Sequence, residues 1–100
     1  MATFKFSTFA DADLDEIWDF ISTDADDVAD KFILILMEKF ELLANHPLIG
    51  RASDDLRPGV RGFPCKNYLI FYFPTDYGVE VYRVLHAARD VELIFTEEHE

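Results

Sequence analysis

The chain has 100 residues, of which 50% are hydrophobic and 15% aromatic, enough to build the core of one domain over residues 1–100. Its single cysteine, Cys65, excludes an internal disulfide and a cysteine-based zinc site and is typical of a reducing cytoplasm. The formal net charge of -11 disfavours direct binding to nucleic acid, and neither a signal peptide nor an apolar run of membrane-spanning length is found. We therefore expect a soluble cytoplasmic protein.

Charge is distributed unevenly along the chain. Nine acidic residues and no Lys or Arg occur between Asp11 and Asp30, whereas six of the 9 basic residues lie between Arg51 and Arg89. Acidic runs of this kind are typical of a solvated helix face. Any cationic site is therefore expected in the second half of the chain.

The N-terminal segment predicts a strand followed by a helix. Thr3–Ser7 alternates phenylalanine with polar residues, as a half-buried strand does. Thr8 then begins a capping pattern completed by Asp11. The helix that follows carries acidic residues, Asp13 among them, that are predicted to point away from its apolar stripe. That stripe has i, i+3, i+4 and i+7 spacing and consists of Leu14, Ile17, Trp18 and Ile21.

A second helix is predicted after the short polar connection Ser22–Asp27, antiparallel to the first. It runs from Val28 to Ala44 and carries more apolar residues than one buried face needs. The surplus consists of Ile33, Leu34, Met37 and Phe40. This surplus either packs under a sheet or forms an exposed docking site for a partner.

Three strands are predicted in the second half: Val60–Pro64, Tyr68–Phe73 and Val79–Leu85. They form an antiparallel meander. Every residue of Tyr68–Phe73 is apolar or aromatic, so both faces of this strand must be covered and it belongs at the centre of the sheet.

The remaining segments are predicted as turns, loops and a short helix. Pro47–Asp55 reads as an irregular loop, and Pro58-Gly59 predicts a type II turn. Asp90 is placed to cap a short terminal helix, and Thr96–Glu100 reads as a charged, frayed tail. This order predicts a two-layer α+β fold, in which the N-terminal strand pairs within the sheet and the helical hairpin covers one face.

Cofactor and metal motifs are not found. The sequence has no glycine-rich phosphate loop, and its three histidines are dispersed, so no cofactor and no metal site are predicted. Cys65 beside Lys66 is either an activated thiol or a small residue at the end of a strand.

Cationic and aromatic residues gather on the predicted sheet. They are Arg57, Arg61, Lys66, Tyr68, Tyr72, Tyr82, Arg83, His86 and Arg89. Arg83 is predicted to share a face with Val81 and Leu85, a position where an arginine needs either an acidic partner or an anionic ligand. The candidate acidic partners are Glu80, Asp55 and Asp90. Together with Arg83, His86 could act as general base and phosphate clamp in RNA cleavage.

Five segments in this order resemble the ParE group of the RelE/ParE toxin superfamily: ADLDEIW, LANHPLIGR, DLRPGVRGFP, NYLIFY and VEVYRVLHAARDVELIF. The resemblance extends roughly from Leu14 to Phe95 and implies a RelE/ParE-like helical hairpin packed on an antiparallel sheet. It further implies the toxin of a type II toxin–antitoxin (plasmid stabilisation) module, which poisons DNA gyrase by binding and has no catalytic residues. The implied partners are gyrase and a cognate antitoxin, either ParD-like or another DNA-binding antitoxin.

The resemblance also suggests where these partners bind. Antitoxin is expected on the apolar surplus of the second helix, Ile33, Met37 and Phe40, where an amphipathic segment would insert side chains at helical spacing. A basic sheet face formed by Arg61, Arg83 and Arg89 is expected to receive acidic antitoxin residues. Gyrase contact is expected in the C-terminal half of the chain and in the terminal segment after His86.

Two alternatives to the gyrase poison stay open. One is a non-toxic member of the family that retains only antitoxin binding. The other is a ribosome-dependent mRNA endoribonuclease similar to RelE, with Arg61, Arg83 and His86 as its site. The strongly negative net charge disfavours the ribonuclease, because ribosomal RNA repels an acidic protein.

Overall fold

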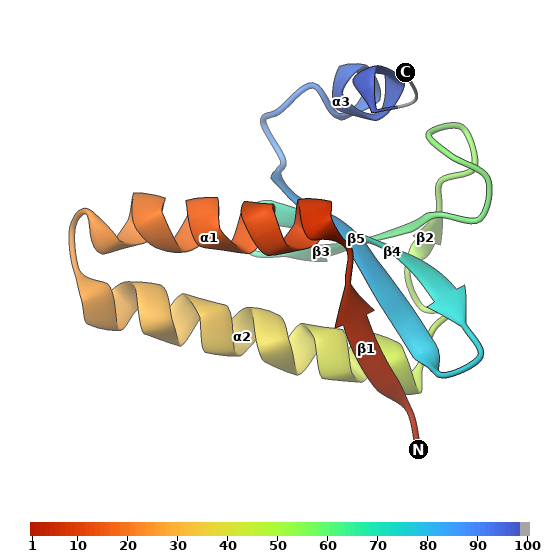
Figure 1. Cartoon of the computed structure of the whole chain (residues 1–100), viewed down its shortest axis with the longest axis horizontal. Helices are drawn as coiled ribbons and strands as arrows, with labels where there is room; N and C mark the ends of the chain where they lie inside the picture. The colour runs from red at the N-terminus through yellow and green to blue at the C-terminus, as the bar shows by residue number, and fades with distance from the viewer. Residues whose placement is uncertain (99–100) are drawn as a thin grey trace.

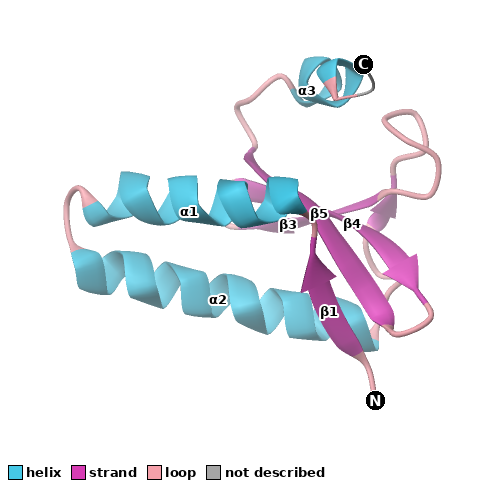
Figure 2. Ribbon diagram, viewed as in Figure 1, coloured by secondary structure: helices cyan, strands magenta, loops and turns pink. Residues whose placement is uncertain are grey.

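The structure is a computed structural model that describes residues 1–98 (Figure 1). Three helices and five strands occur within this range (Figure 2). In chain order they are β1 (Thr3–Phe6), α1 (Thr8–Ser22), α2 (Asp26–Asn45), β2 (Arg51–Ala52), β3 (Arg61–Cys65), β4 (Tyr68–Thr75), β5 (Gly78–His86) and α3 (Val91–Glu97). No helix in this range combines the length and apolar character that crossing a bilayer requires.

The five strands form one sheet in the order β1-β5-β4-β3-β2. The meander of β3, β4 and β5 is antiparallel, and β1 pairs with β5 in parallel, with Phe4 opposite Val79 and Phe6 opposite Val81. The predictions that β4 lies at the centre and that the N-terminal strand joins this sheet are confirmed.

The helical hairpin covers one face of the sheet, as predicted. Helices α1 and α2 lie side by side and antiparallel (Figure 1), and they pack on Ile70, Tyr72 and Val81 through Ile17 and Leu36. Each large apolar side chain buried in this way contributes about 1.5–3 kcal/mol to folding. The apolar stripes of the two helices therefore make this face the larger of two cores.

The opposite face of the sheet has its own smaller core. Val60, Phe71, Tyr82 and Leu85 are buried there beneath Phe95 of α3. The prediction that both faces of the central strand are covered is therefore confirmed. Figure 2 shows α3 set apart from the helical hairpin, and the two pack on separate cores of the sheet.

The start of α1 differs from its prediction. Ser7, and not Thr8, is the N-cap, since its hydroxyl accepts a hydrogen bond from the Ala10 amide at 3.0 Å. The same hydroxyl donates to the Tyr82 carbonyl at 2.6 Å. Ser7 lies between β1 and α1, so its hydroxyl can bond both a helix amide and a sheet carbonyl. Thr8 already lies inside the helix and cannot do both.

The loop after α2 also differs from its prediction. Two residues of it, Arg51 and Ala52, form the edge strand β2 by pairing with Gly62 and Arg61. A strand this short carries no periodic signal, so the sequence predicted an irregular loop. The predicted turn that follows is present: the Val60 amide donates to the Arg57 carbonyl, and Gly59 adopts a φ of +86°.

The C-terminal tail is more ordered than predicted. Helix α3 begins after the Asp90 cap, as expected, but continues to Glu97. Glu98 then packs its carboxylate against the sheet rather than fraying. The last two residues of the predicted tail, His99 and Glu100, lie outside the described residues.

A β-bulge in the pairing of β4 with β5 corrects the predicted face of Arg83. Phe71 pairs with Arg83 and the next residue, Tyr72, pairs with Val81, so β5 has one extra residue at this point. As a result Val81 lies in the larger core and Leu85 in the smaller one. Arg83 cannot share a face with both, because strict alternation is lost at the bulge.

Candidate functional site

A groove of about 400 Å³ runs between the outer sides of α1 and α2. Two of the three predicted antitoxin-binding residues on α2, Ile33 and Met37, line it. The complete lining is Phe6, Asp11, Leu14, Asp15, Trp18, Ile33 and Met37. This is an apolar slot with carboxylates along its α1 side.

The groove follows from helical spacing. Leu14 and Trp18 are four residues apart on α1, and Ile33 and Met37 are four apart on α2, so each pair forms one row along its helix. All four side chains are only half-buried. The indole Nε1 of Trp18 donates to Asp30 of α2 at 2.9 Å, which fixes the ring between the helices. The slot is therefore pre-formed.

Phe40 does not belong to this surface. It is 0% exposed, and its ring packs at 5.7 Å from the ring of Phe4 and 5.3 Å from that of Phe6. The reason is that β1 lies across α2 at this level and covers its side chain. Phe40 supports the groove indirectly, because it packs against Phe6 and Phe6 lines the groove.

The predicted basic sheet face of Arg61, Arg83 and Arg89 is also not formed. Arg61 donates to the backbone carbonyls of Leu48 and Gly50, at 3.2 and 2.7 Å, and so holds the loop after α2. Arg89 is exposed beyond the end of β5. Arg61 binds the loop after α2, Arg83 pairs with acidic residues inside the fold, and Arg89 is exposed, so the three arginines do not make one binding surface.

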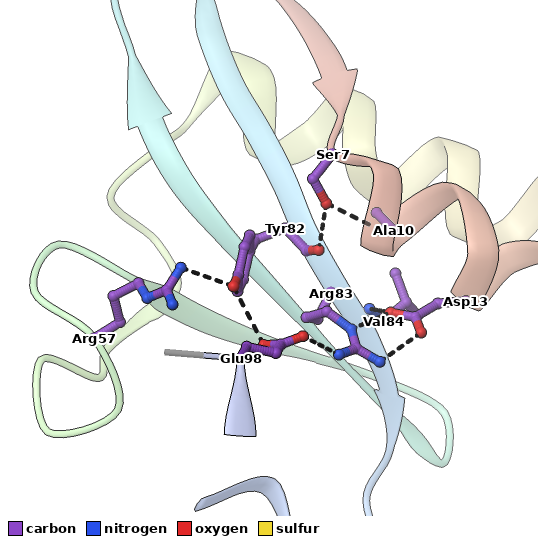
Figure 3. A network of polar contacts seen from close by, with 8 residues as sticks. All are labelled: Ser7, Ala10, Asp13, Arg57, Tyr82, Arg83, Val84 and Glu98. Atoms are coloured by element: carbon purple, nitrogen blue, oxygen red, sulfur yellow. Dashed lines mark hydrogen bonds and ion pairs between the residues drawn. The ribbon is translucent and has the colours of Figure 1, made fainter. Parts of the chain in front are cut away.

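Arg83 lies between two carboxylates from opposite ends of the chain (Figure 3). Its guanidinium donates to both oxygens of Asp13, at 2.7 and 2.8 Å, and it forms a second ion pair with Glu98. The hydrogen bonds that Arg83 donates to Asp13 raise the pKa of Arg83, and Glu98 acts in the same direction, whereas burial lowers it. The expectation of an acidic partner is confirmed, but the partners are not Glu80, Asp55 or Asp90.

Tyr82 extends this network on the far side of Glu98. Arg57 Nη1 donates to the Tyr82 hydroxyl at 2.7 Å, and this hydroxyl donates to Glu98 at 3.2 Å (Figure 3). Burial raises the pKa of Tyr82, with the nearby Glu98 as the second cause. The network joins α1, β5, the end of α3 and the loop before β3. Each donor in it binds an acceptor that also belongs to the network.

The predicted ribonuclease residues are not assembled into a site. Arg83 is held by two carboxylates, and its side chain is 12% exposed. Arg61 and His86 pair with Tyr72 and Tyr68 of β4, four residues and so about 13 Å apart along the strand. A general base and a phosphate clamp would have to lie closer together.

Cys65 is the small buried residue at a strand end, and not an activated thiol. Burial raises the pKa of its thiol, although Lys39 and Lys66 act in the opposite direction. Within residues 1–98, no group of three or more His, Cys, Asp or Glu side chains is arranged to hold a metal ion.

Sequence reasoning missed several residues that matter here. Asp13 was assigned to the solvated acidic face but is 3% exposed. Its position three residues after Ala10 and four before Ile17, both buried, was the available signal. Phe6, Leu14 and Trp18 were assigned only to the core, although they also line the groove.

The chain is similar to known toxins along most of its length. The family model described as "ParE toxin of type II toxin-antitoxin system, parDE" matches residues 4–91. The chain is 36% identical over 91 residues to Toxin ParE1 of two Mycobacterium tuberculosis strains, which covers 89% of this chain and 93% of that protein. It is 33% identical over 88 residues to Toxin ParE1 of Caulobacter vibrioides, covering 86% and 90%.

A solved structure described as the chromosomal ParDE TA system from P. aeruginosa has the same fold. The TM-score is 0.72 at 21% sequence identity, and the match covers 86% of this chain and 96% of that chain.

Proposed function

Because the chain belongs to the ParE toxin family of type II toxin–antitoxin systems, we propose that it is a cytoplasmic toxin whose antitoxin occupies the groove between α1 and α2. The antitoxin inserts an amphipathic helix, with apolar side chains against Leu14, Trp18, Ile33 and Met37. The observation that carries this proposal is the pre-formed apolar slot with i, i+4 spacing on both walls.

The charge of the groove indicates which charged residues the antitoxin helix carries. Asp11 and Asp15 line the slot and are exposed, and no basic residue within the described range 1–98 lines it. Basic residues beside the apolar positions of the antitoxin helix would therefore pair with these carboxylates. Phe40 is buried, and Arg61 and Arg83 bind groups within the toxin itself. The proposed antitoxin contact is therefore centred on Ile33 and Met37.

Met37→Glu tests the antitoxin site. It places an unpaired charge in the slot, so the toxin is expected to stop co-purifying with the cognate antitoxin while its circular dichroism spectrum is unchanged. Leu34→Glu is the matched control, because Leu34 lies on the same helix, is 63% exposed and does not line the groove. Retained binding by Met37→Glu, or equal loss in both variants, would remove the groove as the antitoxin site.

For the target, we propose that the toxin poisons DNA gyrase by binding and without chemistry of its own. Two observations support inhibition by binding over RNA cleavage: Arg61, Arg83 and His86 are separated, and the net charge is -11.

Induced expression without antitoxin in a sensitive bacterium tests the target. Growth arrest with filamentation and induction of the DNA-damage response is expected of a gyrase poison. Arrest with rapid loss of mRNA would instead indicate a ribonuclease. Normal growth in the presence of folded toxin would indicate a family member that retains antitoxin binding alone.

A further inference from the structure

Two adjoining hollows lie on the other side of α1, where its C-terminal half passes the ends of β4 and β5. Their volumes are about 160 and 210 Å³. Phe20, Tyr68 and His86 line both. Arg89 lines the first hollow and Lys66 the second. We refer to these five residues as the basic corner.

The floor of the basic corner is rigid and its rim is apolar. The Tyr68 ring packs edge-on against the His86 ring at 5.2 Å and tilted against the Phe32 ring at 5.4 Å, so two aromatic neighbours hold it. Phe20, in contrast, is 76% exposed. A phenylalanine left in water beside a hollow is the kind of apolar residue that a partner covers.

The polar groups of the basic corner are donors without acceptors. The Nδ1 atom of His86 accepts a hydrogen bond from the Ala88 amide at 3.0 Å, so the neutral ring carries its proton on Nε2 and can donate it. Among residues 1–98, the side chains of Lys66 and Arg89 form no ion pair and the Tyr68 hydroxyl forms no hydrogen bond.

The acceptors near these donors are few. Asp13 lines the first hollow but is engaged by Arg83 and by the Val84 amide. Glu16 also lines it, without an ion pair to any cation among the described residues. The two hollows are therefore lined by four residues with donor groups and by one carboxylate without an ion pair, in a chain whose net charge is -11.

We propose that the basic corner is the surface through which the toxin contacts DNA gyrase, and that it receives an acidic segment of gyrase carrying a large apolar side chain. The carboxylate of that segment accepts from Arg89, His86 or Lys66, and the apolar side chain covers Phe20. This inference rests on the proposed function, since it assigns a contact surface to the gyrase target.

Size and charge favour a protein segment over a nucleic acid or a small ligand. Ligand pockets usually enclose about 300–1,000 Å³, whereas the hollows here enclose about 160 and 210 Å³ each. The overall negative charge repels the phosphates of DNA beyond this corner. Two neighbouring side chains of one protein segment would fill the two adjoining hollows.

Helix α1 separates the basic corner from the antitoxin groove. Residues 11, 14, 15 and 18 line the groove, whereas residues 13, 16, 17 and 20 line the first hollow. At 100° per residue these two sets point in nearly opposite directions. Substitutions in the basic corner are therefore expected to leave antitoxin binding intact, which makes the two functions separable by mutation. Arg89, expected from the sequence on an antitoxin surface, is assigned here to the target side.

The test measures inhibition of purified gyrase in a supercoiling assay by the full-length toxin. Arg89→Glu and Phe20→Ser are each expected to weaken inhibition about 10-fold or more, the effect of losing one central interface contact. Arg51→Glu and Leu48→Ser are matched controls, because both residues are exposed and neither lines the basic corner: Arg51 lies on the edge strand β2 and Leu48 in the loop before it. Unchanged antitoxin binding by all four variants shows that they are folded.

Each other outcome overturns the inference in an identifiable way. If the wild-type chain does not inhibit gyrase, both the proposed target and the inference that depends on it are wrong. If the wild-type chain and the corner variants inhibit equally, only the inference is overturned. If Arg89→Glu and Phe20→Ser lose antitoxin binding but still inhibit gyrase, the corner belongs to the antitoxin interface. If the wild-type chain binds a DNA duplex and Arg89→Glu abolishes this, the occupant is nucleic acid and not a protein segment.

Discussion

Asp13 on α1 binds Arg83 on β5 through hydrogen bonds of 2.7 and 2.8 Å, although the two residues are 70 positions apart in the chain. Asp13 Oδ2 also accepts from the Val84 amide at 2.9 Å. Strand β1 ends at Phe6, so β5 has an unpaired edge beyond Val81. The carboxylate of Asp13 takes the place of the missing strand there.

We predict that Asp13→Ala lowers the free energy of unfolding by about 3–5 kcal/mol, the usual effect of breaking a buried ion pair by removing one partner. Arg83 would keep Glu98 alone, and the Val84 amide would lose its acceptor. Urea unfolding followed by circular dichroism measures the change.

The triple variant Asp13→Ala/Arg83→Met/Glu98→Gln is expected to recover part of this loss, because it removes the buried cation together with both of its acidic partners. Asp15→Ala is the control, since Asp15 is exposed on the same helix. A loss below about 1 kcal/mol for Asp13→Ala, within the range of an exposed ion pair, would contradict a structural role for this carboxylate.

The main elements of the fold could be predicted because they depend on local periodicity. The alternation in Thr3–Ser7, the helical stripes of α1 and α2, and the fully apolar Tyr68–Phe73 each report burial within one element. The partners of Arg83 could not be predicted, since Asp13 and Glu98 reach it only after the sheet has formed. The β-bulge beside Arg83 had no sequence signal.

The candidate groove could be predicted only in part, for a similar reason. Ile33 and Met37 stood out as apolar residues in excess of what one helix face needs, and both line the groove. Phe40 had the same signal but is buried, because β1 crosses α2 at that level. Only the packing of β1 on the hairpin distinguishes these residues.

Glu98 binds the end of α3 to the sheet through its ion pair with Arg83. Glu98→Ala is predicted to destabilise the packing of this helix on the sheet. The ion pair with Arg83 and the hydrogen bond from Tyr82 are both lost, although Arg83 keeps Asp13. Global stability is expected to fall by about 1–2 kcal/mol. Hydrogen exchange of the α3 amides is expected to accelerate by more than that global change explains.

Glu97→Ala provides the control for α3. Glu97 is exposed on the same helix and forms no ion pair within residues 1–98. Equal exchange rates in the Glu97 and Glu98 variants would show that Phe95 alone holds the helix in place.

Gly50 leaves room for the hydroxyl of Tyr72, and Gly50→Ala is predicted to be destabilising. The Gly50 amide donates to this hydroxyl at 2.9 Å, and an added Cβ would lie 2.4 Å from the same oxygen. The loss is expected at about 1–3 kcal/mol, as for other overpacked sites. Gly62→Ala serves for comparison because its Cβ would lie 3.2 Å from the Phe71 ring, and thermal unfolding should rank it as the milder change.

Stability is predicted to fall in alkaline solution. Burial raises the pKa of Tyr72 above its ordinary value of 10.0, against smaller opposing effects of the Gly50 hydrogen bond and Arg61. Burial also raises the pKa values of Tyr68 and Tyr82. The folded chain therefore holds these phenolic protons more tightly than the unfolded chain. The resulting stabilisation is complete below about pH 10 and is lost as pH rises toward the pKa values of the folded state. Urea unfolding at several pH values should show this decline, with a smaller slope in Tyr72→Phe; an unchanged free energy of unfolding through this range would contradict the prediction.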